Sequence, residues 1–262
     1  ETVMGVIKAA EEAKAPVIIQ VYPRLVNEEV GYYLAPVILA AAKKATVPVC
    51  FHLDHGPSEL EAQKILYWGA TGIMYDGSVL PFDLNAKNTA EVVKYAHSKG
   101  VTVEAELGHV GNASVGSISE TGTDTDPGES LTVPEEVARF IETTDVDALA
   151  VAIGTAHGVY QKTPTLRIDR LDEITAVCDR PLVLHGGSGT PNDQMQNAIH
   201  HGITKINIYA DVVGAMNKGL KDKLNAMENP ATWPFLVFAD ARSMMKEVAR
   251  EKLRTFGSAG RL

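Results

Sequence analysis

Short apolar runs rich in valine, isoleucine and leucine recur along this 262-residue chain and alternate with segments of a different period. Runs of this length predict β-strands, and the segments between them carry apolar residues at three- and four-residue spacing, which predicts amphipathic helices. The expected strands are 16–21, 48–53, 71–75, 101–105, 147–153, 181–184 and 204–209. The expected helices include 58–67, 85–98, 134–142 and 191–200.

This alternation of strands and helices indicates a parallel sheet covered on both faces, because crossover helices must pack on the sheet. Such a sheet either stays open in a doubly wound fold or closes into a barrel. Polar clusters follow nearly every run after residue 48, whereas an open sheet gathers its ligands at a single crevice. We therefore expect an α/β fold, a (β/α)8 TIM barrel, formed as a single domain over residues 1–262.

The start of the chain shows a helical pattern instead of a strand. Its apolar positions are Val3, Val6, Ile7 and Ala10. The chain offers seven expected strands, and an eight-stranded barrel without its first strand would leave two unpaired edges. We therefore expect the first β-strand to be missing from the N-terminus of this sequence.

Two segments stand outside the alternation. The stretch 108–133 is rich in Gly, Ser, Thr and Asp and follows the run that carries Glu104 and Glu106. Irregular stretches of this length are commonly lids, so we expect an active-site lid there, with a solvated insertion as the alternative. Residues 229–262 are expected to form a C-terminal helical segment whose basic face is solvated or packed on a neighbouring subunit. The basic residues are Arg242, Lys246, Arg250, Lys252 and Arg254.

Charge and composition narrow the possible partners. A net charge of -9 argues against nucleic acid, because phosphate backbones are bound by clustered lysine and arginine. No apolar run approaches the roughly 20 residues that cross a bilayer, and no signal-peptide pattern is present, so no membrane partner is expected. Cys50 in an expected strand and Cys178 in an expected helix suit two buried thiols, which indicates a reducing, cytoplasmic setting.

Three histidines follow apolar runs, in the segments VPVCFHLDHG, ALAVAIGTAHG and PLVLHGGSG: His55, His157 and His185. The carboxyl ends of barrel strands meet at one mouth, so these side chains can converge on one metal ion. Neutral imidazole suits zinc, and three protein nitrogens with an open fourth position are typical of a catalytic site. Such an ion polarises a carbonyl and holds the charge of an enolate, with Asp54 facing the substrate beside it.

The segment His185-Gly186-Gly187-Ser188-Gly189 precedes a Thr-Pro pair and an expected helix. Glycines allow backbone N–H groups to approach a phosphate, and the following helix presents its positive end. A phosphate site beside the expected metal ion is therefore predicted.

At this point five segments resemble one family, the class II zinc-dependent ketose-bisphosphate aldolases. They are FHLDHG (51–56), VEAELG (103–108), AIGTAHG (152–158), LHGGSG (184–189) and KINI (205–208). The resemblance covers essentially the whole chain, and the family has its own N-terminal strand. It implies a lyase that reversibly cleaves a phosphorylated ketose to dihydroxyacetone phosphate and an aldehyde, and a homodimer or homotetramer.

The resemblance also implies roles for single residues. The three histidines would bind the catalytic zinc, Asp54 would exchange the proton of the substrate's C4 hydroxyl, and Asn207 would contact the enediolate. Asp76 and Glu106 match positions that hold zinc in an alternative, withdrawn site. A lysine nucleophile at Lys205 would make the histidines redundant, so no Schiff base is expected.

The phosphate of the dihydroxyacetone phosphate portion would be bound by three loops, together with a monovalent cation, Na+ or K+. The residues implied are Gly158, Gly186, Gly187, Ser188, Asn207, Ile208, Tyr209 and Ala210.

The sequence departs from the family pattern after Asn207. The family has Asp-Thr or Ala-Thr at the second and third positions, where this chain has Tyr209 and Ala210, so the contact of a threonine hydroxyl with phosphate is lost. Members that cleave bisphosphates often carry a cation six residues after the asparagine, where Val213 stands. A second dianion would lack a strong charge-assisted contact, so we hypothesise a substrate without the distal phosphate.

The expected lid also departs from the family. Its Gly-Gly-x-Glu-Asp is replaced by GNASV at 111–115, which puts Ser114 in the place of the loop glutamate. The acids that could replace this glutamate are Glu120, Asp124, Asp126 and Glu129.

Two other functions fit part of the pattern. A metal-dependent hydrolase on the same barrel would use zinc to activate water, but it commonly needs a His-x-His pair on the first strand. A catalytically silent sugar-phosphate-binding subunit should have lost Asp54 or one of the histidines, and all of them are present. The order of the motifs favours the aldolase.

Overall fold

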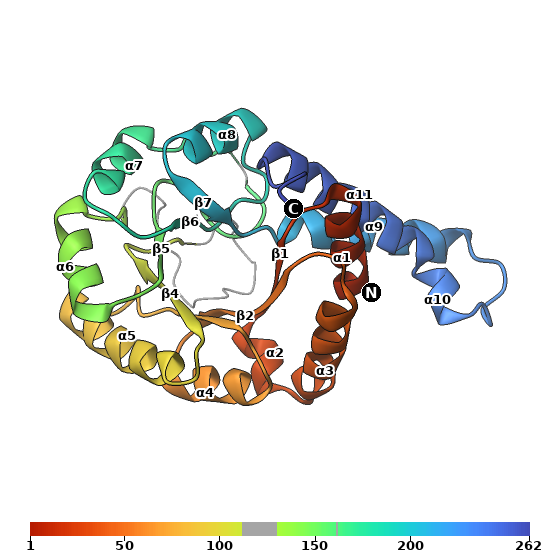
Figure 1. Cartoon of the computed structure of the whole chain (residues 1–262). Coiled ribbons are helices and arrows are strands. Elements are labelled where there is room, and N and C mark those ends of the chain that lie inside the picture. Colours follow the sequence, from red (N-terminus) through yellow and green to blue (C-terminus); the bar gives the residue numbers. More distant parts are fainter. Residues whose placement is uncertain (112–129, 161) are drawn as a thin grey trace.

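The structure, a computed structural model, describes residues 1–111, 130–160 and 162–262. Seven parallel strands form one curled sheet in chain order, with helices around its outside (Figure 1). The strands are β1 (Val17–Val21), β2 (Val49–Gly56), β3 (Gly72–Tyr75), β4 (Thr102–Leu107), β5 (Ala148–Val151), β6 (Leu182–Leu184) and β7 (Ile203–Ile206). The TIM-barrel architecture expected from the sequence is confirmed, and each of the seven expected strands is present.

Helices connect consecutive strands on the outside of the sheet and extend past its last strand. They are α1 (Thr2–Ala13), α2 (Pro23–Asn27), α3 (Glu29–Lys44), α4 (Glu59–Tyr67), α5 (Phe82–His97), α6 (Pro134–Thr144), α7 (Ile168–Thr175), α8 (Asn192–His200), α9 (Ala210–Ala226), α10 (Pro234–Val237) and α11 (Ala239–Thr255). Ser114 and the four candidate acids of the expected lid lie outside the described residues.

The main core lies between the sheet and the helices. In β3, Ile73 and Tyr75 belong to this core, whereas Met74 packs with Ala150 and Val183 inside the curl of the sheet. Successive side chains of a strand point to opposite faces, so this pattern fixes which positions face inward. It is this alternation that delivers polar side chains to the interior of the barrel.

The same alternation places two acids of β4 inside the barrel. Val103, Ala105 and Leu107 belong to the outer core, so Glu104 and Glu106 between them point inward. Glu104 is 3% exposed and Glu106 is fully buried, which means that both carboxyl groups need polar partners.

The C-terminal helices α9, α10 and α11 project away from the barrel (Figure 1). The basic residues of α11 were expected to be solvated or packed on a neighbouring subunit. Instead, α11 packs on α1 and α9, and four of its five cations pair with acids of this chain. These ion pairs are Arg242 with Glu1, Lys246 with Glu12, Arg250 with Glu12, and Lys252 with Asp211.

The two cysteines differ in part from the expectation. Cys50 lies in β2, but Cys178 follows the end of α7 and is not helical. Both thiols are free and half-buried instead of buried. Within the described residues, no helix has the length and apolar character that a membrane span requires.

Candidate metal centre and active site

The three predicted histidines converge at the carboxyl ends of the strands. His55 lies at the end of β2, His157 in the loop after β5, and His185 directly after β6. The centroid of the His55 ring is 4.8 Å from that of His157 and 4.6 Å from that of His185. One ligand atom from each residue lies within 4.8 Å of the others, so the trio can hold one metal ion.

A break in strand regularity turns His55 toward this site. The pairing of β2 with β3 shifts register between Leu53 and Gly56, and His55 has a φ of 48°, in the left-handed region that non-glycine residues rarely adopt. Bulges of this kind re-aim a side chain beside an active site. Because of this break, the side chains of both His55 and its neighbour Asp54 reach the same end of the barrel, as the sequence predicts.

Buried carboxylates hold the far sides of two imidazoles. His55 Nδ1 lies 2.7 Å from Asp76 Oδ2, and His185 Nε2 lies 2.8 Å from Glu104 Oε1. The opposite nitrogens, His55 Nε2 and His185 Nδ1, face each other at 2.8 Å. Metal-ligating histidines typically bind a carboxylate through the second nitrogen in this way, which fixes the tautomer and the ring orientation.

The third histidine supplies an independent test of the metal site. His157 Nε2 is buried and has no hydrogen-bond partner among the described residues. A buried ring nitrogen without a partner is costly, and coordination of a metal ion would satisfy it. The residues present therefore fit a metal ion held by imidazole nitrogens.

Charge is distributed unequally over the trio. Burial alone would lower the pKa of His55, but Asp54, a hydrogen bond to Asp76 and the charge of Glu106 outweigh it and raise this pKa to about 10. Burial and the charge of His55 lower the pKa of both His157 and His185. Without a metal ion, these directions favour a charged imidazolium at His55 and neutral imidazoles at His157 and His185.

A second set of potential ligands overlaps the first. Atoms of His55, Asp76 and Glu106 also lie within 4.8 Å of one another. Glu106 Oε2 is buried without a hydrogen-bond partner among the described residues, and burial, with the charge of Asp76, raises the pKa of Glu106 to about 8. These are the two acids for which the family resemblance implies an alternative metal position.

Asp54 and Asn207 meet beside the histidines. Asn207 Nδ2 donates a hydrogen bond to Asp54 Oδ1 at 3.0 Å, and Lys205 Nζ donates to Asn207 Oδ1 at 2.8 Å. The Asp54 side chain is 18% exposed, so a substrate can reach its carboxylate. The structure thus brings together both residues that the sequence predicts to be catalytic.

Sequence reasoning missed several neighbours of these residues. Glu104 and Lys205 are not among the predicted site residues. Glu104 stands two positions before Glu106 on β4 and therefore shares its face, and Lys205 lies on β7, two positions before Asn207, which directly follows the strand. Ser78 donates to Asp76 Oδ1 at 2.6 Å and contacts His109 Nδ1 at 2.8 Å. No sequence pattern signals this last contact, because the two residues lie in separate loops.

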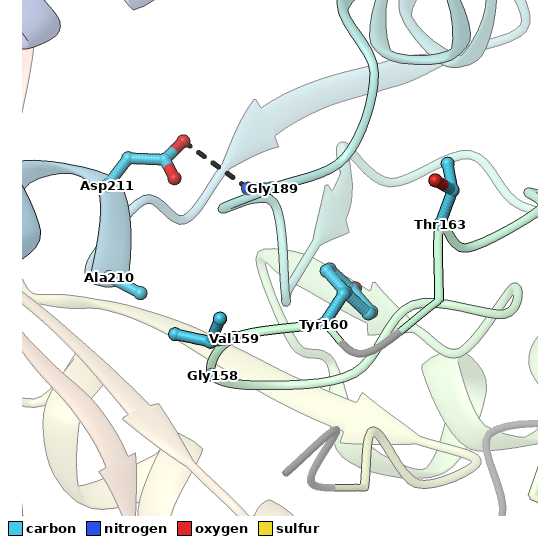
Figure 2. A pocket seen from close by; sticks show the side chains of 7 residues that line it. All are labelled: Gly158, Val159, Tyr160, Thr163, Gly189, Ala210 and Asp211. Carbon is cyan, nitrogen blue, oxygen red and sulfur yellow. Dashed lines mark hydrogen bonds between the residues drawn. The ribbon is translucent and has the colours of Figure 1, made fainter.

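A cavity of about 270 Å³ opens between the loops that carry His157 and His185 and the start of α9. Its lining residues are Gly158, Val159, Tyr160, Thr163, Gly189, Ala210 and Asp211 (Figure 2). Two of the eight predicted phosphate-binding residues, Gly158 and Ala210, line it. In the same view the Asp211 carboxylate accepts a hydrogen bond from Gly189 N at 3.4 Å.

The other predicted phosphate-binding residues lie around this cavity in different roles. Ser188 Oγ accepts hydrogen bonds from the backbone N–H groups of Tyr209 and Asp211, which ties the loop after β6 to the start of α9. Tyr209 is 65% exposed, whereas Ile208 is half-buried against the main core.

The two glycines after His185 are required by close packing. A Cβ on Gly186 would lie 2.5 Å from Ala156 O, and one on Gly187 would lie 2.7 Å from Ile206 Cγ2. The glycine-rich pattern that indicates a phosphate site therefore also reflects the packing of neighbouring loops.

Comparison with known proteins identifies the family. The family described as fructose-bisphosphate aldolase class-II matches residues 1–261. The uncharacterized protein YdjI of Escherichia coli is 38% identical over the whole chain and 90% of its own length. A sulfofructosephosphate aldolase of Alkalicoccus urumqiensis is 36% identical over 98% of this chain and 88% of its own.

Further relatives agree in sequence and in structure. A fructose-bisphosphate aldolase of Staphylococcus epidermidis is 34% identical over the whole chain and 90% of its own length. The crystal structure of the YdjI aldolase from Escherichia coli superposes with a TM-score of 0.85 at 35% identity, covering 99% of this chain and 88% of that one. The chain is thus a lyase that belongs to the class II fructose-bisphosphate aldolase family.

Proposed function

We propose that this protein is a zinc-dependent aldolase that reversibly cleaves a phosphorylated ketose to dihydroxyacetone phosphate and an aldehyde. The observation that carries the proposal is the meeting of three histidine nitrogens with the hydrogen-bonded pair of Asp54 and Asn207 at one mouth. Zinc and a carboxylate base could also serve a hydrolase, so the preference for an aldolase comes from the family match.

His55, His157 and His185 would hold the zinc ion, and Asp76 and Glu106 would hold it in a second, withdrawn position. Bound zinc supplies a Lewis acid that polarises the ketose carbonyl. The carboxylates of Asp76 and Glu104 keep the rings of His55 and His185 oriented for this task.

Asp54 acts as the general base in cleavage and as the general acid in synthesis. A carboxylate oxygen of Asp54 takes the proton of the C4 hydroxyl, the C4 oxygen forms the aldehyde carbonyl, and the C3–C4 bond breaks with its electron pair remaining on C3. Asn207 holds Asp54 through its amide N–H and lies close enough to His185 to contact the enediolate oxygen that develops.

The phosphate of the dihydroxyacetone phosphate portion would occupy the cavity beside Gly158, Gly189 and Ala210. The cavity borders the first turn of α9, where backbone N–H groups and the helix dipole favour an anion. The predicted set (Gly158, Gly186, Gly187, Ser188, Asn207, Ile208, Tyr209 and Ala210) with Na+ or K+ stays part of this proposal.

The substrate would lack a distal phosphate. One relative is named for sulfofructosephosphate and another for fructose bisphosphate, so the distal group must be inferred from this chain. Val213 stands in the first turn of α9 and offers no charge there, and Tyr209 departs from the pattern of the bisphosphate-cleaving members. We also propose a homodimer or homotetramer and a cytoplasmic location, the latter consistent with two free thiols.

Metal analysis combined with a coupled assay for triose-phosphate release tests the proposal. We expect about one zinc ion per chain, release of triose phosphate from ketose 1-phosphates, loss of release after chelation, and recovery with zinc but not with magnesium. A metal-dependent hydrolase or a silent binding subunit would release no triose phosphate. Release that survives complete removal of the metal ion would contradict the zinc mechanism.

A further inference from the structure

A half-buried lysine, Lys205, contacts both the acid/base residues and the metal-binding residues of the candidate active site. Lys205 Nζ lies 2.8 Å from Asn207 Oδ1 and 2.7 Å from Glu104 Oε2. The Lys205 side chain is 15% exposed and that of Glu104 is 3% exposed. Asn207 contacts Asp54, the predicted acid/base, and Glu104 contacts His185, a predicted metal ligand. The Lys205 ammonium group is therefore bound to a neighbour of each.

We propose that Lys205 is a positioning residue that sets the amide orientation of Asn207 and holds Glu104 against His185. The inference rests on the proposed function for the roles of Asp54, Asn207 and His185. It assigns to Lys205 a task in which the ammonium group acts only as a hydrogen-bond donor and a fixed charge.

The first part of the task concerns the Asn207 amide. A lysine ammonium only donates hydrogen bonds and a carboxylate only accepts them. Asn207 must therefore turn Oδ1 toward Lys205, which leaves Nδ2 to donate to Asp54 Oδ1 at 3.0 Å. Nδ2 also lies 3.3 Å from both ring nitrogens of His185, so an amide without Lys205 would keep these neighbours but lose one of the two charged contacts that orient it.

The second part concerns the Glu104 carboxylate. Its Oε1 accepts from His185 Nε2 at 2.8 Å, and its Oε2 lies 3.7 Å from His52 Nε2. Burial and the charge of Lys205 lower the pKa of His52 to about 4, so His52 is neutral and Lys205 balances the buried carboxylate. Without the ammonium group 2.7 Å away, Oε2 loses its charge-assisted partner and the buried charge stays unbalanced, so the carboxylate is no longer fixed in the orientation that holds His185.

The same contacts explain why Lys205 is no nucleophile. A lysine that forms a Schiff base must present a neutral amine to the substrate. The Lys205 ammonium group instead donates to the side chains of Glu104 and Asn207. Its position on β7, two residues before Asn207, is therefore explained by positioning and not by covalent chemistry.

Three variants of the full chain separate the two parts: Lys205→Met, the double variant Glu104→Gln/Lys205→Met, and the remote surface control Lys218→Met. Zinc affinity is measured by competition with a chelator, and kcat and KM are measured by triose-phosphate release. In the double variant the buried charge is balanced, and the neutral glutamine side chain introduced in place of Glu104 keeps an oxygen that accepts from His185 Nε2.

For Lys205→Met we expect zinc affinity to fall by about ten- to a hundredfold and kcat to fall as well, with KM little changed. The double variant should recover most of the zinc affinity while kcat stays low, because Asn207 still lacks its donor. Lys218→Met should match the wild type in every measurement. If Lys205→Met does not fold, the charge-balanced double variant carries the test through the same two readouts.

Two results would overturn the inference. Wild-type kcat in the double variant would show that Lys205 only balances Glu104, and wild-type zinc affinity together with wild-type kcat in Lys205→Met would show that it positions neither partner. Failure of the wild-type protein to release triose phosphate would contradict the proposed function instead, and the zinc affinities would still test the contact between Lys205, Glu104 and His185.

Discussion

His55 and His185, 130 residues apart in sequence, turn Nε2 and Nδ1 toward each other at 2.8 Å. A carboxylate holds the opposite nitrogen of each ring, from Asp76 on His55 and from Glu104 on His185. Two nitrogens at this distance need a proton between them, because two lone pairs would repel each other. A tetrahedral zinc ion bound by both nitrogens would take the place of this proton and move the rings apart to an N···N distance of about 3.3 Å. A proton and a metal ion therefore compete for this pair.

This competition predicts how zinc binding depends on pH. Surrounding acids raise the pKa of His55 to about 10, so in the metal-free protein His55 holds a proton at neutral pH that zinc must displace. Zinc affinity should rise with pH from 6 to 9, by up to about tenfold per pH unit. Calorimetry in buffers of different ionisation enthalpy should detect at least one proton released per zinc ion at pH 7.

The carboxylate partner supplies the control for this measurement. In Asp76→Asn the hydrogen bond and charge that raise the pKa of His55 are both weakened, so the pH dependence should become shallower. Zinc binding without proton release in the wild type would show that His55 is neutral in the metal-free protein, against the prediction.

Replacement of Asp54 separates proton transfer from metal binding. Asp54→Asn should lower kcat by about 10²- to 10⁴-fold, the range typical of a lost general acid/base, while the zinc content stays near that of the wild type because Asp54 is not in the ligand set. Turnover by steady-state kinetics and metal content by elemental analysis check both parts. A variant that keeps turnover would remove Asp54 from its proposed role.

The fold and the convergence of the three histidines were predictable because both follow from periodicity. The strand with Glu104 and Glu106 alternates with outward Val103, Ala105 and Leu107, and three histidines at strand ends must share one mouth in a parallel barrel. The position of His55 was less predictable, since it depends on a register shift and a left-handed residue within β2.

The missed parts of the site are contacts between distant strands. The local sequence around Lys205 does not predict the ion pair of its ammonium group with Glu104, because that contact depends on the curl of the whole sheet. The basic face of α11 was misjudged for the same reason, since its partners Glu1 and Glu12 lie at the other end of the chain. Periodicity gives the face of a residue, whereas only the tertiary structure gives its partner.

The ion pair of Lys252 and Asp211 should affect phosphate binding. Lys252 Nζ lies 2.8 Å from Asp211 Oδ2, and this carboxylate borders the cavity near Gly189. If phosphate binds in this cavity as proposed, Lys252→Met leaves an unbalanced negative charge beside it, so KM should rise by about fivefold, equivalent to about 1 kcal/mol, with kcat unchanged. The double variant Lys252→Met/Asp211→Asn should restore KM; an unchanged KM in the single variant would place the phosphate elsewhere.

Gly186 should be intolerant of a side chain for steric reasons. It has a φ of 68°, and a Cβ would lie 2.5 Å from Ala156 O. Gly186→Ala should lower the free energy of unfolding by about 1–3 kcal/mol and weaken zinc binding, because His185 is the preceding residue. Gly100→Ala is the matched control, since Gly100 has a φ of 72° and open space around its Cβ position. If denaturant unfolding showed that both variants lose the same free energy of unfolding, the clash with Ala156 would have no role.

A charge at residue 213 should shift substrate preference. Val213 lies in the first turn of α9, six residues after Asn207, and the wild type is expected to have a higher kcat/KM with fructose 1-phosphate than with fructose 1,6-bisphosphate. Val213→Arg should raise kcat/KM for the bisphosphate by roughly tenfold or more, because a hydrogen bond to a charged group contributes about 1.5–3 kcal/mol. Val213→Met adds length without charge and should leave kcat/KM unchanged for both substrates. Comparable wild-type efficiency on both substrates would contradict a site that lacks a distal phosphate contact.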